Sequence, residues 1–264
     1  MPEKPAYDDD LRLAHVLADD ADGITMDRFR SLDLQVETKG DETPVSDADR
    51  RAEEQLRSML RRARPRDAVH GEEYDDTGHG PRRWVIDPID GTKNFVRGVP
   101  VWATLIALMH GDEVVAGVVS APALGRRWWA ARGSGAWTGR SLSAARRCRV
   151  SDVVALGEAS FSYSSWVSWE QAGRVEGFVE VLRSTWRTRA YGDFWSYMLV
   201  AEGAVDAAAE PDLELHDIAP LTVIVEEAGG RFTDLAGVPG ARAGSALATN
   251  GLLHDTLLET LAKR

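Results

Sequence analysis

Apolar residues recur along the chain with two different periods. Near the start, Leu11, Ala14 and Leu17 recur at the spacing of one helix face. Asp8 to Asp10 stand just before this face, where carboxylates stabilise a helix N-terminus. Helical spacing and capping residues predict helices at residues 8–30, from a cap at Ser46 or Asp47 to about Arg64, and at residues 173–182, 192–202, 217–228 and 252–261.

Short apolar runs and alternating segments predict strands between these helices. Within the segment RRWWAARGSGAWTG (126–139), Trp128 and Trp129 are expected to pack on opposite faces of a strand, before a glycine turn. The segment KGDETPVSDADR (39–50) is expected to be a loop. Further strands are expected at residues 32–38, 68–70, 84–86, 101–109, 114–120, 155–161, 204–209, 231–234 and 246–249.

The order of these elements indicates the fold class. Strands and helices alternate in clusters, and no repeat, low-complexity segment or obvious linker divides the chain. At 264 residues the chain can be one large domain or two halves that share a core. We expect a layered α/β fold that forms one unit over residues 1–264, with packed halves of roughly 1–148 and 149–264.

The chain is acidic, with a formal net charge of −11. This charge disfavours nonspecific binding to nucleic acid or anionic membranes, but it is compatible with divalent cations and cationic substrates. Two local charge runs are expected to be solvated helix surface, namely the acidic residues at 19–22 and the arginines at 61–66.

The cysteine content and the chain start favour a cytoplasmic protein. Cys148 is the only cysteine, so no internal disulfide can form, and we expect this thiol to be structural. No apolar run is long enough to span a bilayer, and the start, MPEKPAYDDD, lacks the apolar core of a signal peptide.

Four carboxylates stand at places where ligands bind in layered α/β folds. Glu72, Asp87 and Asp90 each follow a short apolar run, and Asp217 is expected to begin a helix. Four such carboxylates in a dry site would repel one another, so either their pKa values rise or hard cations neutralise them. Carboxylate oxygens favour Mg²⁺ or Mn²⁺, and the six histidines show no zinc-site spacing.

Within the stretch WVIDPIDGTKNF (84–95), we expect Pro88, Ile89 and Gly91 each to have a separate role. Pro88 would fix a turn after the strand, and the Ile89 carbonyl would lie between two aspartate ligands. Gly91 permits a close approach of the backbone, and the amides of Gly91 and Thr92 can hold phosphate oxygens at a helix start. A capped turn without a ligand is the alternative. The spacing excludes an aspartyl-phosphate loop and an EF-hand.

These motifs together resemble the inositol monophosphatase family of Mg²⁺-dependent, lithium-sensitive phosphatases. The resemblance covers almost the whole chain and is carried by PVSDAD (44–49), GEE (71–73), WVIDPIDGTKNF, ARGSGAW (131–137) and LHDIAPLTVIVEEAGG (215–230). It implies an α/β fold, an α+β layered sandwich of αβαβα architecture like that of inositol monophosphatase and fructose bisphosphatase. Related enzymes are typically homodimers, so we expect a homodimer.

The resemblance also implies roles for individual residues. Two or three Mg²⁺ ions per site are expected, with Mn²⁺ as a possible substitute. One ion would be held by Glu72, Asp87 and the Ile89 carbonyl, a second by Asp87, Asp90 and Asp217, and a third near Asp49 and Glu72. The catalytic residues would be Asp49, Thr92 and Glu72, with the Thr92–Asp49 pair helping to deprotonate the attacking water. Gly91 and Thr92 would bind phosphate, Asp90 and Asp217 would also face the substrate, and Lys39 and Glu73 would lie nearby.

The segment WRTRAYGDFWSYMLVAEGAVDAAAEP (186–211) is expected to select the alcohol. Asp193 and Glu210 fall where relatives contact the organic part of the substrate, and two carboxylates suit amino or imidazolium groups. RAYGDFWSY resembles the actinobacterial histidinol-phosphatase branch of the family, which implies hydrolysis of L-histidinol phosphate in histidine biosynthesis. Arg189 would contact phosphate or orient Asp193.

Several alternatives remain open at this stage. Asp193 can be a helix N-cap after Gly192 rather than a substrate ligand. The substrate can be inositol 1-phosphate or a nucleotide 3′-phosphate, and a Mg²⁺-binding scaffold without turnover is the non-enzyme alternative. His216 stands where the family usually has Trp, and we expect it to pack rather than to touch the metal. The segment FSYSSWVSW (161–169) can line a lid or pack at a subunit contact.

Overall fold

The computed structural model describes residues 7–40 and 43–263, so the expectation for the chain start (residues 1–6) and residues 41 and 42 of the expected loop lie outside it. The helices are α1 (Asp8–Arg28), α2 (Asp47–Ala63), α3 (Thr92–Val96), α4 (Trp166–Gln171), α5 (Val175–Ser184), α6 (Asp193–Ala201), α7 (Leu215–Glu227) and α8 (His254–Leu261). The strands are β1 (Val36–Thr38), β2 (Pro44–Ser46), β3 (Ala68–Gly71), β4 (Arg82–Asp90), β5 (Ala103–His110), β6 (Glu113–Ala121), β7 (Arg126–Ala131), β8 (Ala136–Gly139), β9 (Arg146–Arg147), β10 (Ser160–Ser162), β11 (Arg187–Arg189), β12 (Ala207–Glu210), β13 (Arg231–Thr233) and β14 (Ala246–Thr249).

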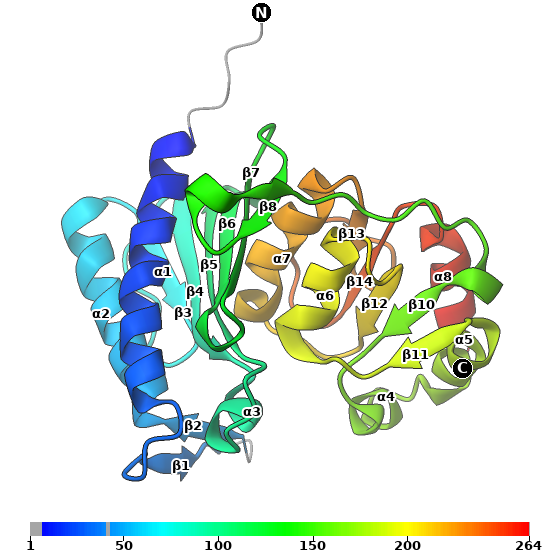
Figure 1. Cartoon of the computed structure of the whole chain (residues 1–264), viewed down its shortest axis with the longest axis horizontal. Coiled ribbons are helices and arrows are strands. Elements are labelled where there is room, and N and C mark those ends of the chain that lie inside the picture. Colours follow the sequence, from blue (N-terminus) through cyan, green and yellow to red (C-terminus); the bar gives the residue numbers. More distant parts are fainter. Residues whose placement is uncertain (1–6, 41–42, 264) are drawn as a thin grey trace, which may run out of the picture.

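Helices and two sheets alternate in layers across the molecule (Figure 1). The seven-stranded sheet has the order β3-β4-β5-β6-β7-β8-β9, and only β3 and β4 are parallel. The five-stranded sheet has the order β11-β10-β12-β14-β13. Helices α1 and α2 cover the outer face of the first sheet, α6 and α7 lie between the sheets, and α4, α5 and α8 lie beyond the second sheet. This order confirms the expected layered α/β sandwich.

Three large apolar clusters fill the spaces between these layers. Trp129 belongs to the cluster under α1 and α2, whereas Trp128 belongs to the cluster shared with α6, α7 and the second sheet. Successive strand residues point to opposite faces of a sheet, so the two tryptophans lie as expected. Phe178 belongs to the third cluster, between the second sheet and the outer helices. Burial of this apolar surface is the main favourable contribution to the fold.

Side chains at the helix starts fix where two important helices begin. Ser46, not Asp47, caps α2: its hydroxyl accepts from the Ala48 amide, and its own amide donates to Asp49 at 2.8 Å. Helix α7 begins earlier than residue 217, with Glu214 as its N-cap and Asp217 in its first turn. Both capping devices therefore direct an aspartate toward a helix start.

The strand expected at residues 32–38 is the clearest error in the fold. Only β1 forms there, all its residues are exposed, and it pairs with β2 inside the expected loop. Alternation was misleading here because β1 has no buried residue, whereas Val45 and Ser46 of its partner β2 are buried. The strand expected at 155–161 is also wrong in part, since Leu156–Glu158 is a 3₁₀ turn and β10 begins at Ser160.

The strand expected at residues 84–86 is the centre of the longer β4. This strand continues through Asp90, and its register against β5 shifts between Asp87 and Asp90. The metal motif is therefore an irregular strand end rather than a turn. Pro88 fits such an irregularity because no ladder hydrogen bond from its nitrogen is needed there.

Two expectations about surface charge need correction. Asp22 is not solvated: it accepts hydrogen bonds from Arg127 and Ser120, and its side chain is 21% exposed. Arg64 pairs with the buried Asp10.

Cys148 is buried, as a structural thiol should be. No helix in residues 7–40 and 43–263 is long and apolar enough to cross a bilayer.

Candidate active site

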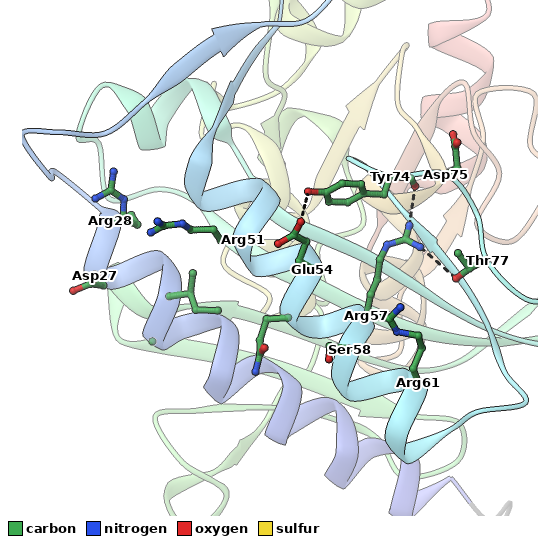
Figure 2. A pocket seen from close by; sticks show the side chains of 13 residues that line it. Asp27, Arg28, Arg51, Glu54, Arg57, Ser58, Arg61, Tyr74, Asp75 and Thr77 are labelled. Atoms are coloured by element: carbon green, nitrogen blue, oxygen red, sulfur yellow. Dashed lines mark hydrogen bonds between the residues drawn. The ribbon is translucent and has the colours of Figure 1, made fainter.

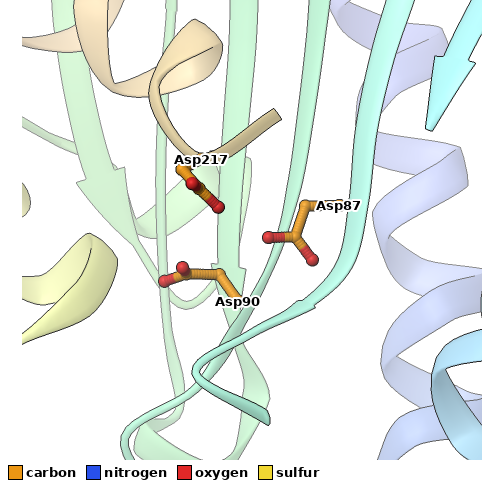
Figure 3. A group of neighbouring side chains, drawn as sticks. All are labelled: Asp87, Asp90 and Asp217. Carbon is orange, nitrogen blue, oxygen red and sulfur yellow. The ribbon is translucent and has the colours of Figure 1, made fainter. Parts of the chain in front are cut away.

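Three aspartates from distant parts of the chain meet where β4 ends and α7 begins (Figure 3). Asp87 and Asp90 come from β4, and Asp217 comes from the first turn of α7. One carboxylate oxygen from each residue lies within 4.8 Å of the other two. Within the described residues, no lysine or arginine forms an ion pair with any of the three.

Burial and mutual repulsion make these carboxylates hard to ionise without a cation. Burial raises the pKa of Asp87 well above its ordinary value, and the charges of Glu72, Asp90 and Asp217 raise it further. Burial likewise raises the pKa of Asp90, followed by the charges of Asp193 and Asp217. Such a set of oxygen donors fits a hard divalent cation, which would remove this repulsion.

Glu72 and Glu73 lie beside this cluster and share one ammonium group. Lys39 Nζ lies 2.7 Å from Glu72 Oε1 and 2.6 Å from Glu73 Oε1. Burial raises the pKa of Glu73 to about 7, against the hydrogen bond from Lys39. The parallel pairing of β3 with β4 brings the GEE segment next to Asp87.

Asp49 and Thr92 form the pair expected from the motifs. Thr92 Oγ1 lies 3.2 Å from Asp49 Oδ1 and 2.9 Å from the Ile89 carbonyl oxygen, so its single proton can serve either acceptor. Asp49 is fully buried, and burial raises its pKa to about 6 despite two hydrogen bonds from Ser46.

Gly91 places the start of α3 close to the Asp49–Thr92 pair and to the aspartate cluster. Its backbone has a φ of 85°, in the left-handed region, and it is the N-cap of α3. A Cβ at this position would lie 3.0 Å from the Val101 carbonyl oxygen and 3.3 Å from Asp193 Oδ2. The amides of Gly91 and Thr92 thus lie beside the aspartate cluster, where a phosphate group can be bound.

Asp193 is not a helix cap. Gly192 occupies the N-cap of α6 without a side-chain hydrogen bond, and Asp193 has a φ of 48°, which is unusual for a residue with a side chain. Its amide donates to Ser164 Oγ at 2.9 Å, and its Oδ2 accepts from Asn94 Nδ2 at 3.0 Å. Burial raises its pKa to about 6, and the charge of Asp217 adds to this effect. The N-cap alternative is therefore wrong.

Glu210 ends β12 in a buried position next to the aspartates. Burial raises its pKa to about 8. It lines a cavity of about 140 Å³ together with Asp90, Asp193 and Tyr197. A larger cavity of about 490 Å³ is lined by Lys39, Glu72, Thr92, Asp193, His216 and Asp217, among others. The two cavities share Asp193 and Asp217, so they meet at the metal cluster.

His216 packs, as expected, but it also faces the larger cavity. Its ring stacks on that of His70 at a centroid distance of 6.0 Å. Its Nε2 lies 3.7 Å from Asp217 Oδ1, which is too far for a hydrogen bond.

The structure does not bring Arg189 to this site. Arg189 lies on β11, the edge strand of the second sheet, is exposed, and donates to the Thr188 carbonyl. Conversely, Asn94 and Tyr197 were not singled out by the sequence. Asn94 lies inside the DPIDGTKNF stretch, which is the only signal that could have found it.

Another cavity lies away from this site, between α1, α2 and the loop at residues 74–77 (Figure 2). It has a volume of about 1110 Å³. Some of its polar groups are paired: Arg57 pairs with Glu53 behind the cavity and donates to the Tyr74 carbonyl, and the Tyr74 hydroxyl donates to Glu54. Unlike the aspartate cluster, it is lined by charges of both signs: four arginines (Arg28, Arg51, Arg57 and Arg61) and three acidic residues (Asp27, Glu54 and Asp75).

Comparisons with known proteins agree with this geometry. The model of the inositol monophosphatase family matches residues 7–264. A histidinol-phosphatase of Streptomyces coelicolor is 64% identical over 264 residues, with 98% of this chain and 99% of that protein covered. A histidinol-phosphatase of Mycobacterium tuberculosis is 56% identical, with 96% of this chain and 98% of that protein covered.

Solved structures show the same architecture. The Thermotoga maritima IMPase superposes with a TM-score of 0.85 at 32% identity, covering 96% of both chains. An inositol monophosphatase from Zymomonas mobilis superposes with a TM-score of 0.86 at 31% identity, covering 98% of this chain and 100% of that one. The aspartate cluster, the layered fold and these similarities agree that the chain belongs to the inositol monophosphatase family.

Proposed function

We propose that this chain is a Mg²⁺-dependent phosphatase that hydrolyses L-histidinol phosphate to L-histidinol and phosphate in histidine biosynthesis. Relatives with 64% and 56% identity over nearly the whole chain are histidinol-phosphatases. The structural observation that carries the proposal is the presence of two further carboxyl groups beside the metal cluster, the buried Glu210 and the partly buried Asp193. A cationic group in the alcohol part of the substrate would stabilise the ionised form of both carboxyl groups.

The residues of the cluster suit two or three Mg²⁺ ions, with Mn²⁺ as a possible substitute. Glu72, Asp87 and the Ile89 carbonyl would hold one ion, and Asp87, Asp90 and Asp217 a second, with Asp49 and Glu72 near a third. When bound, magnesium activates water, shields the phosphoryl oxygens and stabilises the leaving alkoxide. Compensation of the buried negative charge is the support for this assignment.

The chain's own groups would then position the phosphate and move the proton. The amides of Gly91 and Thr92 would face the phosphate oxygens from the start of α3. Thr92 would accept a proton from the attacking water while donating its own to Asp49, whose Oδ1 lies within hydrogen-bond distance. Water would attack in line with the leaving oxygen, so no covalent phospho-enzyme is required.

Asp193 and Glu210 would select the alcohol. Histidinol carries an ammonium group and an imidazole ring, and charge-assisted hydrogen bonds to carboxylates are roughly twice as strong as neutral ones. Inositol is neutral and has no cationic group that would stabilise the ionised form of two additional carboxyl groups. Arg189 has no part in this proposal.

The working state that we propose is a cytoplasmic homodimer in which both halves of the chain form one catalytic unit. The single buried cysteine is compatible with a reducing compartment. The halves share an apolar cluster that contains residues of both sheets, which favours one unit over two independent domains.

A substrate panel at fixed Mg²⁺ tests the proposal. We expect kcat/KM for L-histidinol phosphate to exceed the values for inositol 1-phosphate and adenosine 3′,5′-bisphosphate by at least tenfold. Phosphate release should also require Mg²⁺ and stop with a chelator. A larger kcat/KM for inositol 1-phosphate would refute the substrate assignment, and absence of any Mg²⁺-dependent release would favour a scaffold that lost turnover.

A further inference from the structure

The small cavity beside the metal cluster contains two buried polar atoms without a well-formed hydrogen bond. Tyr197 and Glu210 both line it and are 1% and 8% exposed. Within the described part of the chain, neither the hydroxyl oxygen of Tyr197 nor Oε1 of Glu210 has a partner with good hydrogen-bond geometry, although the two groups lie near each other and Glu210 lies near Ser164. Buried polar atoms are nearly always paired, so two that face the same cavity without a well-formed hydrogen bond can be completed by a polar ligand.

The position of Tyr197 explains its ring but not its hydroxyl. Tyr197 lies on α6, and its ring contacts Phe232 at a centroid distance of 5.8 Å within the apolar cluster between the sheets. A phenylalanine would make the same packing contacts without burying a hydroxyl that lacks a well-formed hydrogen bond, which costs free energy. The hydroxyl therefore needs a reason other than packing.

The walls of the cavity restrict the kind of ligand. The charged residues that line it are all acidic, which favours a cation, and the remaining walls are apolar: Phe194, Leu213 and Leu221. Its volume of about 140 Å³ equals the share of between four and five liquid waters at about 30 Å³ each. A small flat ring with polar atoms on one edge and carbon on the other fits these walls. A ring with hydroxyl groups on every carbon does not, since several would face apolar side chains.

We infer that this cavity is the imidazole subsite of the site, with Tyr197 and Glu210 as the partners of the two ring nitrogens. The inference rests on the proposed function and adds a residue, Tyr197, and a position for one part of the substrate. Glu210 accepts from one ring N–H. The Tyr197 hydroxyl accepts from the other N–H of an imidazolium, or donates to the bare nitrogen of a neutral ring. Asp193, at the junction of the two cavities, is then left for the ammonium group.

The test compares two substrates that differ only in the ring. L-histidinol phosphate carries the ammonium and the imidazole, whereas alaninol phosphate carries the ammonium alone. Tyr197→Phe removes one hydroxyl and keeps the ring packing. We expect the ratio of kcat/KM for histidinol phosphate to that for alaninol phosphate to fall about tenfold or more, mainly through KM, because a hydrogen bond in the buried subsite is lost.

Tyr163→Phe is the matched control. Its ring packs on Phe178 in the outer cluster, and it does not line the cavity. The control should keep the wild-type ratio. A wild-type ratio in Tyr197→Phe, with histidinol phosphate still the preferred substrate of the wild type, would overturn the subsite alone. Failure of the wild type to prefer histidinol phosphate over inositol 1-phosphate would overturn the proposed function and the subsite with it.

Discussion

Asn94 connects the proposed metal centre to the pocket for the alcohol. Its side-chain amide donates to both the Val101 carbonyl at 2.9 Å and Asp193 Oδ2 at 3.0 Å. Next to Asp193, the Phe194 amide donates to Asp90 Oδ2 at 2.7 Å. A left-handed backbone conformation costs free energy for a residue with a side chain, such as Asp193. Contacts from both halves of the chain therefore hold Asp193 in this conformation.

We predict that Asn94→Ala weakens substrate recognition more than it weakens phosphate chemistry. Loss of the hydrogen bond to a carboxylate should raise KM for L-histidinol phosphate about tenfold and lower kcat by less. Steady-state kinetics checks this. The same substitution in an Asp193→Asn background should have a much smaller effect, because the partner is already changed. Full additivity of the two substitutions would contradict the coupling.

The aspartates of the site could be predicted from the sequence, but two residues around them, Asn94 and Tyr197, could not. Asp87, Asp90 and Asp217 stand in local motifs, and the structure brings them together. Asn94 and Asp193 are 99 residues apart, and only the packed fold shows that they meet. Tyr197 looks like an ordinary core residue of a helix until the hydroxyl without a well-formed hydrogen bond is seen.

At the scale of elements, the position of Asp217 depends on how closely α7 packs on the first sheet. Gly117 in β6 allows this approach: a Cβ there would lie 2.9 Å from Pro220 Cα and 2.9 Å from Val223 Cγ1. Pro220 and Val223 both belong to α7, which also carries Asp217. Any side chain at position 117 must therefore move the helix that bears a proposed metal ligand.

We predict that Gly117→Ala destabilises the fold by about 1–3 kcal/mol through overpacking and weakens Mg²⁺ binding severalfold. Urea unfolding and a Mg²⁺ titration check the two effects.

Gly23→Ala is the matched control. Gly23 lies within α1, where an added Cβ meets nothing within 4 Å, so alanine should instead stabilise the helix by about 0.5–1 kcal/mol. Normal stability and Mg²⁺ affinity in Gly117→Ala would refute the close-packing account.

The elements that could be predicted are those with one buried face. Helices α1 and α2 and the pair β5–β6 pack against the core, so their apolar spacing is visible in the sequence. The exposed strand β1 and the edge strand β11 have no such spacing. Helix α4 was missed because it is short and its Trp166 and Val167 are exposed.

At the scale of the whole molecule, the site joins the two sheets. Asp87 and Asp90 belong to the first sheet, whereas Asp193, Glu210 and Asp217 come from the second half of the chain, around the helix layer between the sheets (Figure 1). Acidic groups gather at this junction, and the described lysine and arginine side chains are too few there to balance their negative charge. The metal-free protein therefore carries electrostatic strain that depends on pH.

We predict that the metal-free protein loses stability as the pH rises from 6.5 to 8. The folded pKa of Glu210 is about 8, above its ordinary value of 4.5, so folding stabilises the protonated form. This contribution is fully present below the unfolded pKa and is lost as the pH rises toward 8, by about 1–2 kcal/mol between pH 6.5 and 8.

Urea unfolding in the presence of a chelator, at several pH values, measures this loss. Glu210→Gln cannot ionise, so its stability should change less across the same interval. An equal slope in the wild type and in Glu210→Gln would show that another group causes the pH dependence.

The most direct test of the central claim, that aspartates from distant parts of the chain hold metal, is calorimetric titration of Mg²⁺ with and without phosphate. We expect saturable binding to the wild type and at least tenfold weaker binding to Asp90→Asn, which loses one charged ligand. Asp75→Asn, at an exposed position away from the cluster, should bind like the wild type. No saturable binding to the wild type, or equal binding to Asp90→Asn, would contradict the account.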